Sequence, residues 1–261
     1  MLAKETPPLL LAEVANDDID PAPFLVSEKY DGVRAVWDGQ RLRFRSGRPV
    51  PAPAWFTGGL PAAPLDGELW LARGRFDEVS GIVRQREPRD EQWRRLHYMV
   101  FEMPHGEGPF TQRAARIEQL ASATAASPLR AVVQRRVADR AGLKALFDDV
   151  LAGGGEGVML HRADAPYCTG RSQVLLKMKP LSDEEAKVVA HLPGKGKYAG
   201  MMGALVVQTH EGRRVRLGSG FTDELRRHPP PIGSTVTYAY RDRTPSGVPR
   251  FASFVRMADE F

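Results

Sequence analysis

The 261-residue sequence predicts an α+β fold, in which a domain of mixed strands and helices is followed by a smaller all-β domain. Two amphipathic helix patterns lie among strand-like segments in the first two thirds of the chain. After Lys179-Pro180, short β-type runs separated by turn residues follow. Residues 184–261 also carry 12 Lys and Arg against 8 Asp and Glu, whereas residues 1–183 carry 25 against 24. We therefore expect two domains, at residues 1–182 and 183–261.

The first domain should begin with an extended lead-in over residues 1–22 and continue with alternating strands and helices. Strand patterns occupy residues 24–39, 41–50, 65–71, 97–103, 156–161 and 173–180. The first two patterns meet at Asp38-Gly39, a dipeptide typical of tight hairpin turns. Helix patterns occupy residues 76–87, 90–96, 111–126 and 141–154. Residues 51–64 are rich in Pro and Gly and predict a loop.

The second domain has the sequence pattern of a small β-barrel or β-sandwich. Its strand-like runs occupy residues 186–193, 203–210, 213–219 and 234–242. Short strands at even spacing, separated by turn residues, are typical of small all-β domains.

The composition limits the class of protein. Hydrophobic residues make up 42% and charged residues 26%, which is typical of a globular protein with a packed core. Cys168 is the single cysteine, so an intramolecular disulfide and a Cys-rich zinc site are both excluded. No apolar run approaches the roughly 20 residues of a membrane-spanning helix. The net charge of +5 is compatible with a polyanionic partner.

Lys29 is a candidate nucleophile, in the segment Glu28-Lys29-Tyr30-Asp31-Gly32-Val33-Arg34. A lysine amine becomes nucleophilic at neutral pH where burial or neighbouring cations lower its pKa. Arg34, Lys177 and Lys179 would supply such cations if the fold gathers them around Lys29. Taken alone, the same pattern also fits a surface lysine in a turn between strands.

The segment from Lys29 to Arg34 resembles the K-x-D-G-x-R signature of the covalent nucleotidyltransferases, which are DNA ligases, RNA ligases and mRNA capping enzymes. Further segments resemble the other motifs of that superfamily, in the same order. They are Phe44-Arg45-Ser46-Gly47 (with Phe44 where the family has Ser), Asp66-Gly67-Glu68, Met99-Val100-Phe101-Glu102, Glu156-Gly157-Val158 and Leu176-Lys177-Met178-Lys179. The chain resembles in particular the ATP-dependent DNA ligases of the minimal bacterial kind, including the Lig E type.

The resemblance implies a fold, a set of site residues and cofactors. The fold is an ATP-grasp-like nucleotidyltransferase domain of antiparallel sheets and helices, followed by an OB-fold domain. Lys29 would be the catalytic residue that takes AMP from ATP. The residues implied to bind ATP or AMP are Glu28, Arg34, Arg45, Glu68, Phe101, Lys177 and Lys179. Glu68 and Glu156 would hold Mg²⁺ (or Mn²⁺), because carboxylates suit hard cations beside phosphate oxygens.

Most of these residues have a plainer interpretation when each is taken alone. Phe101 fits a core position in an apolar strand. Glu68 and Glu156 fit acids of surface turns, and Lys177 or Lys179 fits a solvated strand edge. The ordered set of motifs, rather than any one residue, favours the nucleotidyltransferase interpretation.

The basic second domain resembles the OB-fold that follows the catalytic core in DNA ligases, and OB-folds bind nucleic acid in basic grooves. The residues expected to contact DNA are Arg34 near the nick, Lys195, Lys197, Arg213, Arg214, Arg216, Arg241 and Arg243. A solvated face is the alternative for several of them. The segment from Pro249 to Arg256 resembles the C-terminal motif that orients pyrophosphate, which makes Arg250 and Arg256 candidates for that role.

The expected function is the sealing of 5′-phosphorylated nicks in duplex DNA through a lysyl-AMP intermediate and a DNA-adenylate, in DNA repair, replication or recombination. We expect a monomer with nicked double-stranded DNA as its partner and no membrane association. The Lig E resemblance suggests a processed periplasmic protein, and the compartment is otherwise cytoplasmic. An RNA ligase or capping-type enzyme, and a non-catalytic nucleic-acid binder, are the alternatives.

Overall fold

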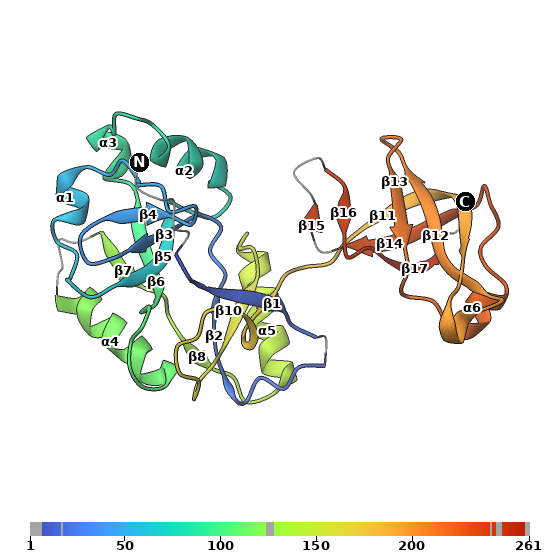
Figure 1. Cartoon of the computed structure of the whole chain (residues 1–261), viewed down its shortest axis with the longest axis horizontal. Coiled ribbons are helices and arrows are strands. Elements are labelled where there is room, and N and C mark those ends of the chain that lie inside the picture. Colours follow the sequence, from blue (N-terminus) through green and yellow to red (C-terminus); the bar gives the residue numbers. More distant parts are fainter. Residues whose placement is uncertain (1–6, 17, 124–127, 241, 244–246, 259–261) are drawn as a thin grey trace. The chain divides into compact units, whose positions relative to one another are not determined.

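The chain forms two compact units, Met1–Lys179 and Pro180–Phe261 (Figure 1). The computed structural model describes residues 7–258 except 17, 124–127, 241 and 244–246. Two five-stranded sheets with helices make up the first unit, and a third five-stranded sheet dominates the second. The boundary expected from the sequence, between residues 182 and 183, falls inside the first strand of the second unit.

The first sheet joins the two ends of the first unit. Its strands, in spatial order, are β1 (Leu10–Val14), β10 (Gly170–Met178), β9 (Val158–Arg162), β2 (Phe24–Glu28) and β8 (Arg135–Arg136). β1 pairs in parallel with β10, and the other pairs are antiparallel. The lead-in expected over residues 1–22 therefore contains a strand. Its partner lies some 160 residues away in the sequence, so no local pattern announces it.

The second sheet carries the middle of the first unit. Its strands, in spatial order, are β4 (Leu42–Phe44), β3 (Val33–Trp37), β5 (Leu65–Trp70), β6 (His97–Glu102) and β7 (Leu129–Ala131). β6 and β7 are parallel and the remaining pairs antiparallel. Trp37 of this sheet forms one core with Phe56 and Trp93, which lie on helical segments, whereas Phe24, Leu143 and neighbours form another under the first sheet.

The single strand expected over residues 24–39 is wrong, because this segment forms β2 in one sheet and β3 in the other. Between them, Lys29 to Gly32 cross from the first sheet to the second. Gly32 passes so close to β5 that a Cβ there would lie 2.3 Å from the carbonyl oxygen of Leu69. The crossing places Lys29 where both sheets supply neighbours.

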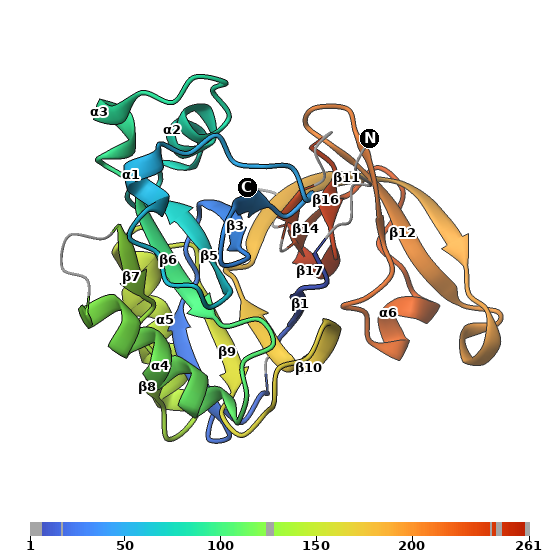
Figure 2. The same cartoon turned by 60° about the vertical axis from the view of Figure 1, so that its left-hand side comes forward.

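Helices cover the sheets of the first unit. They are α1 (Ala54–Thr57), α2 (Phe76–Val83), α3 (Asp90–Trp93), α4 (Phe110–Ala123) and α5 (Arg140–Ala152). α4 packs beside β6 and β7 (Figure 2). The Asp139 carboxylate caps α5 by accepting a hydrogen bond from the Gly142 N–H at 2.8 Å. α1 lies within the loop expected over residues 51–64, and residues 124–126 of the expected helix 111–126 lie outside the described residues.

The second unit is built on one antiparallel sheet. Its strands, in spatial order, are β13 (Arg214–Leu217), β12 (Met202–Thr209), β11 (Ser182–Pro193), β14 (Thr235–Tyr240) and β17 (Ser253–Met257). A small hairpin adds β15 (Asp242–Arg243) and β16 (Pro249–Arg250), and two short helical segments are α6 (Asp223–Arg227) and the 3₁₀ turn Gly196–Tyr198. Each of the four expected strand runs contains a strand, while α6 and β17 are additions. In the part of the chain that the structure describes, we find no helix with the length and apolarity needed to cross a membrane.

Candidate active site

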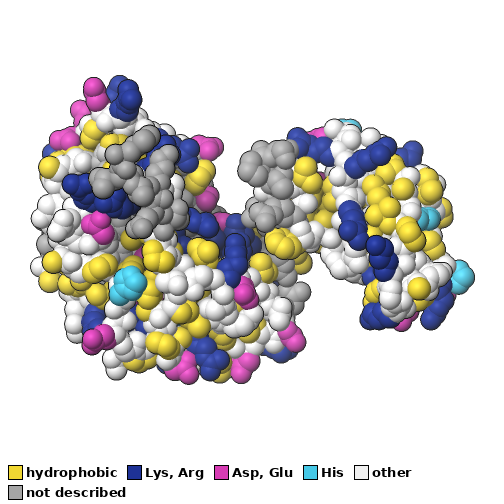
Figure 3. All heavy atoms as spheres, in the orientation of Figure 1, with side chains coloured by type: hydrophobic (Ala, Val, Ile, Leu, Met, Phe, Trp, Pro, Cys, Tyr) yellow, Lys and Arg dark blue, Asp and Glu magenta, His cyan; other side chains and the backbone are white. Residues whose placement is uncertain are grey.

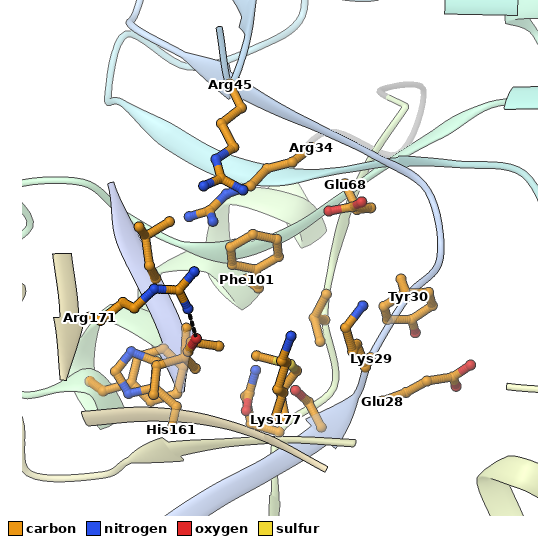
Figure 4. Close-up of a pocket in the computed structure, with 18 residues that line it drawn as sticks. Glu28, Lys29, Tyr30, Arg34, Arg45, Glu68, Phe101, His161, Arg171 and Lys177 are labelled. Atoms are coloured by element: carbon orange, nitrogen blue, oxygen red, sulfur yellow. Dashed lines mark hydrogen bonds between the residues drawn. The ribbon is translucent and has the colours of Figure 1, made fainter. Parts of the chain in front are cut away.

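A pocket of about 300 Å³ in the first unit collects residues from both sheets. Seven residues expected to bind ATP or AMP, or to take AMP, line it, namely Glu28, Lys29, Arg34, Arg45, Glu68, Phe101 and Lys177. In Figure 4, Lys177 lies below the Phe101 ring, Lys29 and Glu68 lie to its right, and Arg34 and Arg45 lie above it. The structure thus gathers residues from five separate motifs around one cavity.

Glu156 connects two lysines beside this pocket. Its carboxylate forms ion pairs with the Nζ atoms of Lys29 and Lys179, and all three side chains are about four-fifths buried. The backbone N–H of Lys29 also donates to the carbonyl of Gly157 at 2.8 Å, so strand β2 is tied to the turn that carries Glu156. Lys29 is therefore held by both its backbone and its side chain.

Two carboxyl groups near Lys29 hold their protons more tightly than usual. Burial raises the pKa of Glu68 to about 8, although the positive charges of Lys29 and Arg34 oppose the rise. Burial and the negative charge of Glu156 also raise the pKa of Asp31. Burial is the larger cause of both shifts, and the negative charge of Glu156 adds to each.

The residues present fit a magnesium ion. Within the described residues no three His, Cys, Asp or Glu side chains converge as a metal cage. Mg²⁺ does not require one, because it is commonly held by one or two carboxylates together with water and substrate phosphates. Glu68 and Glu156 offer such oxygen donors beside Lys29.

Arg34 is held in place by three groups. Its Nε and Nη2 donate to the two oxygens of the buried Asp66 carboxylate at 2.9 and 2.6 Å, and Nη2 also donates to the Leu10 carbonyl at 2.8 Å. The guanidinium carbon lies 5.4 Å from the centre of the Phe101 ring, a cation–π distance. Asp66 thus orients Arg34, and Arg34 contacts the wall of the pocket.

Glu28 has a partner outside the pocket. Arg73 donates two hydrogen bonds of 2.8 Å to its carboxylate and a third, of 3.0 Å, to the Gly153 carbonyl. In Figure 4 the Glu28 carboxylate points away from Phe101 and Lys177. The structure therefore places Glu28 at the edge of the cavity, held by an arginine that the sequence motifs do not include.

The comparisons with known proteins match both units. Residues 1–179 match the model of the ATP dependent DNA ligase domain, and residues 193–257 match that of the DNA ligase OB-like domain. A DNA ligase of Haemophilus influenzae is 38% identical over 248 residues, which cover 95% of this chain and 91% of that protein. This chain belongs to the ATP-dependent DNA ligase family.

Solved structures agree with that assignment. One, from a structure–function study of Lig E DNA ligases that describes DNA binding with a minimal scaffold, is 42% identical with a TM-score of 0.69, and the match covers 96% of this chain and 98% of that one. The Chlorella virus DNA ligase-adenylate, at 23% identity and a TM-score of 0.57 over 98% and 100% of the chains, shares the fold. The predicted fold class and the predicted ligase activity with ATP are confirmed.

The same pocket also contains residues that the sequence motifs did not single out. His161 lies two positions after Met159 on β9, and both line the pocket, as alternate residues of a strand share a face. The His161 ring stacks on Phe110 at 3.6 Å between centroids, and its Nε2 lies 3.0 Å from the Glu102 carboxylate. The alternation along Glu156–His161 is the sequence signal that would have found His161.

Tyr30, Gln134 and Arg171 are further pocket residues that were not expected from the sequence. Arg171 donates to the Ala12 carbonyl at 2.7 Å, which joins β10 to β1. Tyr30 packs edge-on against Trp70 at 5.0 Å between ring centroids. Because Gln134 and Arg171 stand outside recognisable motifs, only the fold brings them to the cavity.

The residues expected to contact DNA in the second unit have diverse surroundings. Lys195, Arg214 and Arg216 are exposed, Lys197 lies 4.7 Å above the Tyr198 ring, and Arg213 pairs with Glu211. Arg243 donates to Glu184, to the Tyr240 hydroxyl and to the Gly247 carbonyl. Arg241 and the side chain of Arg250 lie outside the described residues, and Arg256 lies on β17. Figure 3 shows several Lys and Arg side chains on one face of this unit.

Proposed function

We propose that Lys29 is the nucleophile of this ligase and that the enzyme, as a monomer, seals nicks in duplex DNA. The Lys29 nitrogen forms a bond to the α-phosphorus of ATP while the bond to pyrophosphate breaks. The AMP group then passes to the 5′-phosphate at the nick, and the 3′-hydroxyl displaces AMP. The observation that carries the proposal is the position of Lys29, which lines the pocket and contacts Glu156 beside Lys179.

Glu156 would accept a proton from Lys29 in the first step. An ammonium has no lone pair, so Lys29 must lose a proton before it attacks phosphorus. The Glu156 carboxylate would receive that proton, and the hydrogen bond that it accepts from Lys29 Nζ supports this role. Lys179, which shares the same carboxylate, and Lys177, which lines the pocket, would balance the negative charge of the phosphates.

Mg²⁺ (or Mn²⁺) would be held by Glu68 and Glu156. When bound, the cation supplies positive charge to the phosphate oxygens that carry the developing charge of the reaction. Removal of divalent cations with EDTA should abolish protein adenylylation, and added Mg²⁺ should restore it. Glu68→Gln should require a higher Mg²⁺ concentration for half-maximal rate, and an unchanged requirement would remove Glu68 from the metal site.

The remaining pocket residues would bind the nucleotide. Phe101 offers a flat ring on which the base can stack, with Arg34 fixed against it. Arg45 lies beside Arg34 and would reach the nucleotide or the DNA end. A contact between Glu28 and adenine would require Arg73 to release that carboxylate first.

DNA would be bound by basic residues of both units. The proposed contacts are Arg34, Lys195, Lys197, Arg213, Arg214, Arg216, Arg241 and Arg243, with Arg250 and Arg256 reserved for pyrophosphate. Their charges suit the phosphate backbone, which dominates the affinity of proteins for DNA. Arg243 forms an ion pair with Glu184, and it would have to leave this partner to contact a phosphate.

Incubation with ATP labelled in the α-phosphate and Mg²⁺, followed by a nicked duplex, tests the proposal in two stages. The native protein should acquire the label and then seal the nick. Lys29→Ala should show no labelling, whereas Lys144→Ala, which removes an exposed lysine of α5, should label normally. Labelling of the Lys29→Ala protein at the native rate would refute the assignment. Labelling without sealing of DNA, but with sealing of nicked RNA, would make the enzyme an RNA ligase.

A further inference from the structure

Gln134 lies at the edge of the first sheet, immediately before β8. In the β2–β8 ladder, Val26 pairs with Arg135 and Leu25 with Arg136. The next step of this antiparallel register places Gln134 beside Ser27, and both residues line the pocket. Ser27 precedes Lys29 by two residues, or roughly 7 Å along an extended strand. Gln134 thus belongs to the wall of the cavity that receives the nucleotide.

The side-chain oxygen of Gln134 is buried and has no hydrogen-bond partner among the described residues. Three other polar side chains of the pocket have partners, because Arg34 binds Asp66, Glu28 binds Arg73 and His161 binds Glu102. The other buried polar side-chain atoms found without a partner belong to residues that do not line the pocket. Buried acceptors are normally paired, so this oxygen calls for a donor from the ligand.

The surroundings of Gln134 suit a flat aromatic base. Val132, Phe110 and Leu175 present apolar side chains to the same pocket, and Phe101 offers a ring face. The adenine base of ATP carries one N–H donor group, its 6-amino group. A 6-oxopurine base presents a carbonyl oxygen at that position, and two acceptors facing each other repel.

We propose that the Gln134 side-chain oxygen accepts a hydrogen bond from the 6-amino group and thereby selects adenine nucleotides for transfer to Lys29. This inference rests on the proposed function of the pocket. A site built to hydrogen-bond a substrate group discriminates against an analogue that lacks it, because the protein group is then left unpaired. Gln134 is in this sense a specificity-determining residue.

The test compares ATP with purine riboside triphosphate, in which hydrogen replaces the 6-amino group, as donors for labelling of Lys29. The native enzyme should prefer ATP by about 10-fold to 100-fold in kcat/KM. Gln134→Leu should lower kcat/KM for ATP to the value for the analogue and leave the analogue unaffected. Gln92→Leu makes the same change at a second buried, unpartnered glutamine oxygen that does not line the pocket, and it should keep the full preference.

A second variant guards against a folding defect in the first. Gln134→Glu keeps an oxygen acceptor at the same place, so it should retain a preference for ATP over the analogue. An equal loss with both nucleotides in Gln134→Leu would mean that Gln134 only packs the wall, and the proposal would fall. It would also fall if the preference for ATP over 2′-deoxy-ATP changed instead, since the oxygen would then bind ribose. Absence of labelling with ATP in the native enzyme would contradict the proposed function itself, and with it this inference.

Discussion

At the scale of single residues, backbone contacts explain why two motif positions are glycine. Gly157 has a φ of +142°, and a Cβ there would lie 2.2 Å from the carbonyl oxygen of Met178. Gly32 has a similarly close contact with the Leu69 carbonyl. These contacts bring Glu156 and Lys29 together, since the Gly157 carbonyl accepts the hydrogen bond from the Lys29 N–H. The glycines thus act on the site through backbone position.

We predict that Gly157→Ala destabilises the protein and slows adenylylation of Lys29. A strained φ together with backbone overlap should cost about 3 kcal/mol in the free energy of unfolding. Gly154→Ala is the matched control, because Gly154 also has a positive φ (+79°) but a Cβ there meets nothing within 4 Å. It should cost about 1–2 kcal/mol, the cost of the φ alone. Urea unfolding measures both, and equal costs would show that the contact with Met178 is unimportant.

At the scale of elements, one buried carboxylate links a strand of each sheet to a helix. Glu102 at the end of β6 receives hydrogen bonds of 2.7 and 2.9 Å from Arg113 of α4, and His161 of β9 lies 3.0 Å away. All three residues are buried. Because His161 lines the pocket, this network sets the position of one pocket wall relative to α4.

The network of Glu102, Arg113 and His161 should make the free energy of unfolding fall at acid pH. Burial alone would raise the pKa of Glu102, but the hydrogen bonds from Arg113 and His161 hold it below its usual value. A carboxyl whose pKa is lower in the folded protein than the roughly 4.3 of an unfolded chain stabilises the fold above that pH. This contribution is lost as the pH falls from about 4.3 through the folded pKa.

Glu102→Gln should therefore lower the free energy of unfolding by about 3–5 kcal/mol at pH 7, because Arg113 is left buried without its counter-charge. The variant should also lose less stability than the native protein between pH 5 and pH 3, a range set by these pKa values. Urea unfolding over that range measures both effects. Glu118→Gln, on the exposed face of α4, is the control and should show the stability of the native protein at each pH. The prediction would be contradicted if Glu102→Gln lost as much stability between pH 5 and pH 3 as the native protein does.

At the scale of the whole molecule, the positive charge is distributed unevenly between the two units. The first unit is nearly neutral overall, and its positive charge at the pocket is matched by carboxylates such as Asp66 and Glu156. The second unit carries most of the excess positive charge. On β13, Arg214 and Arg216 are exposed while Val215 and Leu217 are buried, so two cations share one face of the strand. Such a face suits the DNA backbone.

We predict that Arg214→Ala/Arg216→Ala weakens DNA binding and leaves adenylylation of Lys29 intact. Each lost phosphate contact reduces the slope of log affinity against log salt concentration by about 0.9, so the double variant should lose about 1.8. Titration of a nicked duplex at several salt concentrations measures the slope. Arg84→Ala/Arg86→Ala removes the same charge from exposed positions of the first unit and should keep the native slope. Equal slopes in all three proteins would remove β13 from the DNA-binding surface.

Much of the fold followed from local patterns. The strands of β5, β6, β9 and β10, the helices α4 and α5, and the β-rich second unit all lie where periodicity predicted them. Strand β1 and the break between β2 and β3 could not be predicted from local patterns, because they depend on pairing with strands that are distant in the sequence. For the site, the ordered motifs indicated seven residues that line the pocket. They did not indicate Gln134, His161 or Arg171, which reach the cavity through pairing of β8, β9 and β10.

The family and the fold class followed from the order of residue types along the chain, and the same order proposed the candidate site residues. The partners of those residues became visible only in the folded chain. It paired Glu156 with Lys29 and Lys179, Arg34 with Asp66, and Glu28 with Arg73. It also left the Gln134 oxygen without a partner within the described chain. The physical reason is that charge pairing and burial act through space, between residues that strand pairing brings together from distant parts of the sequence.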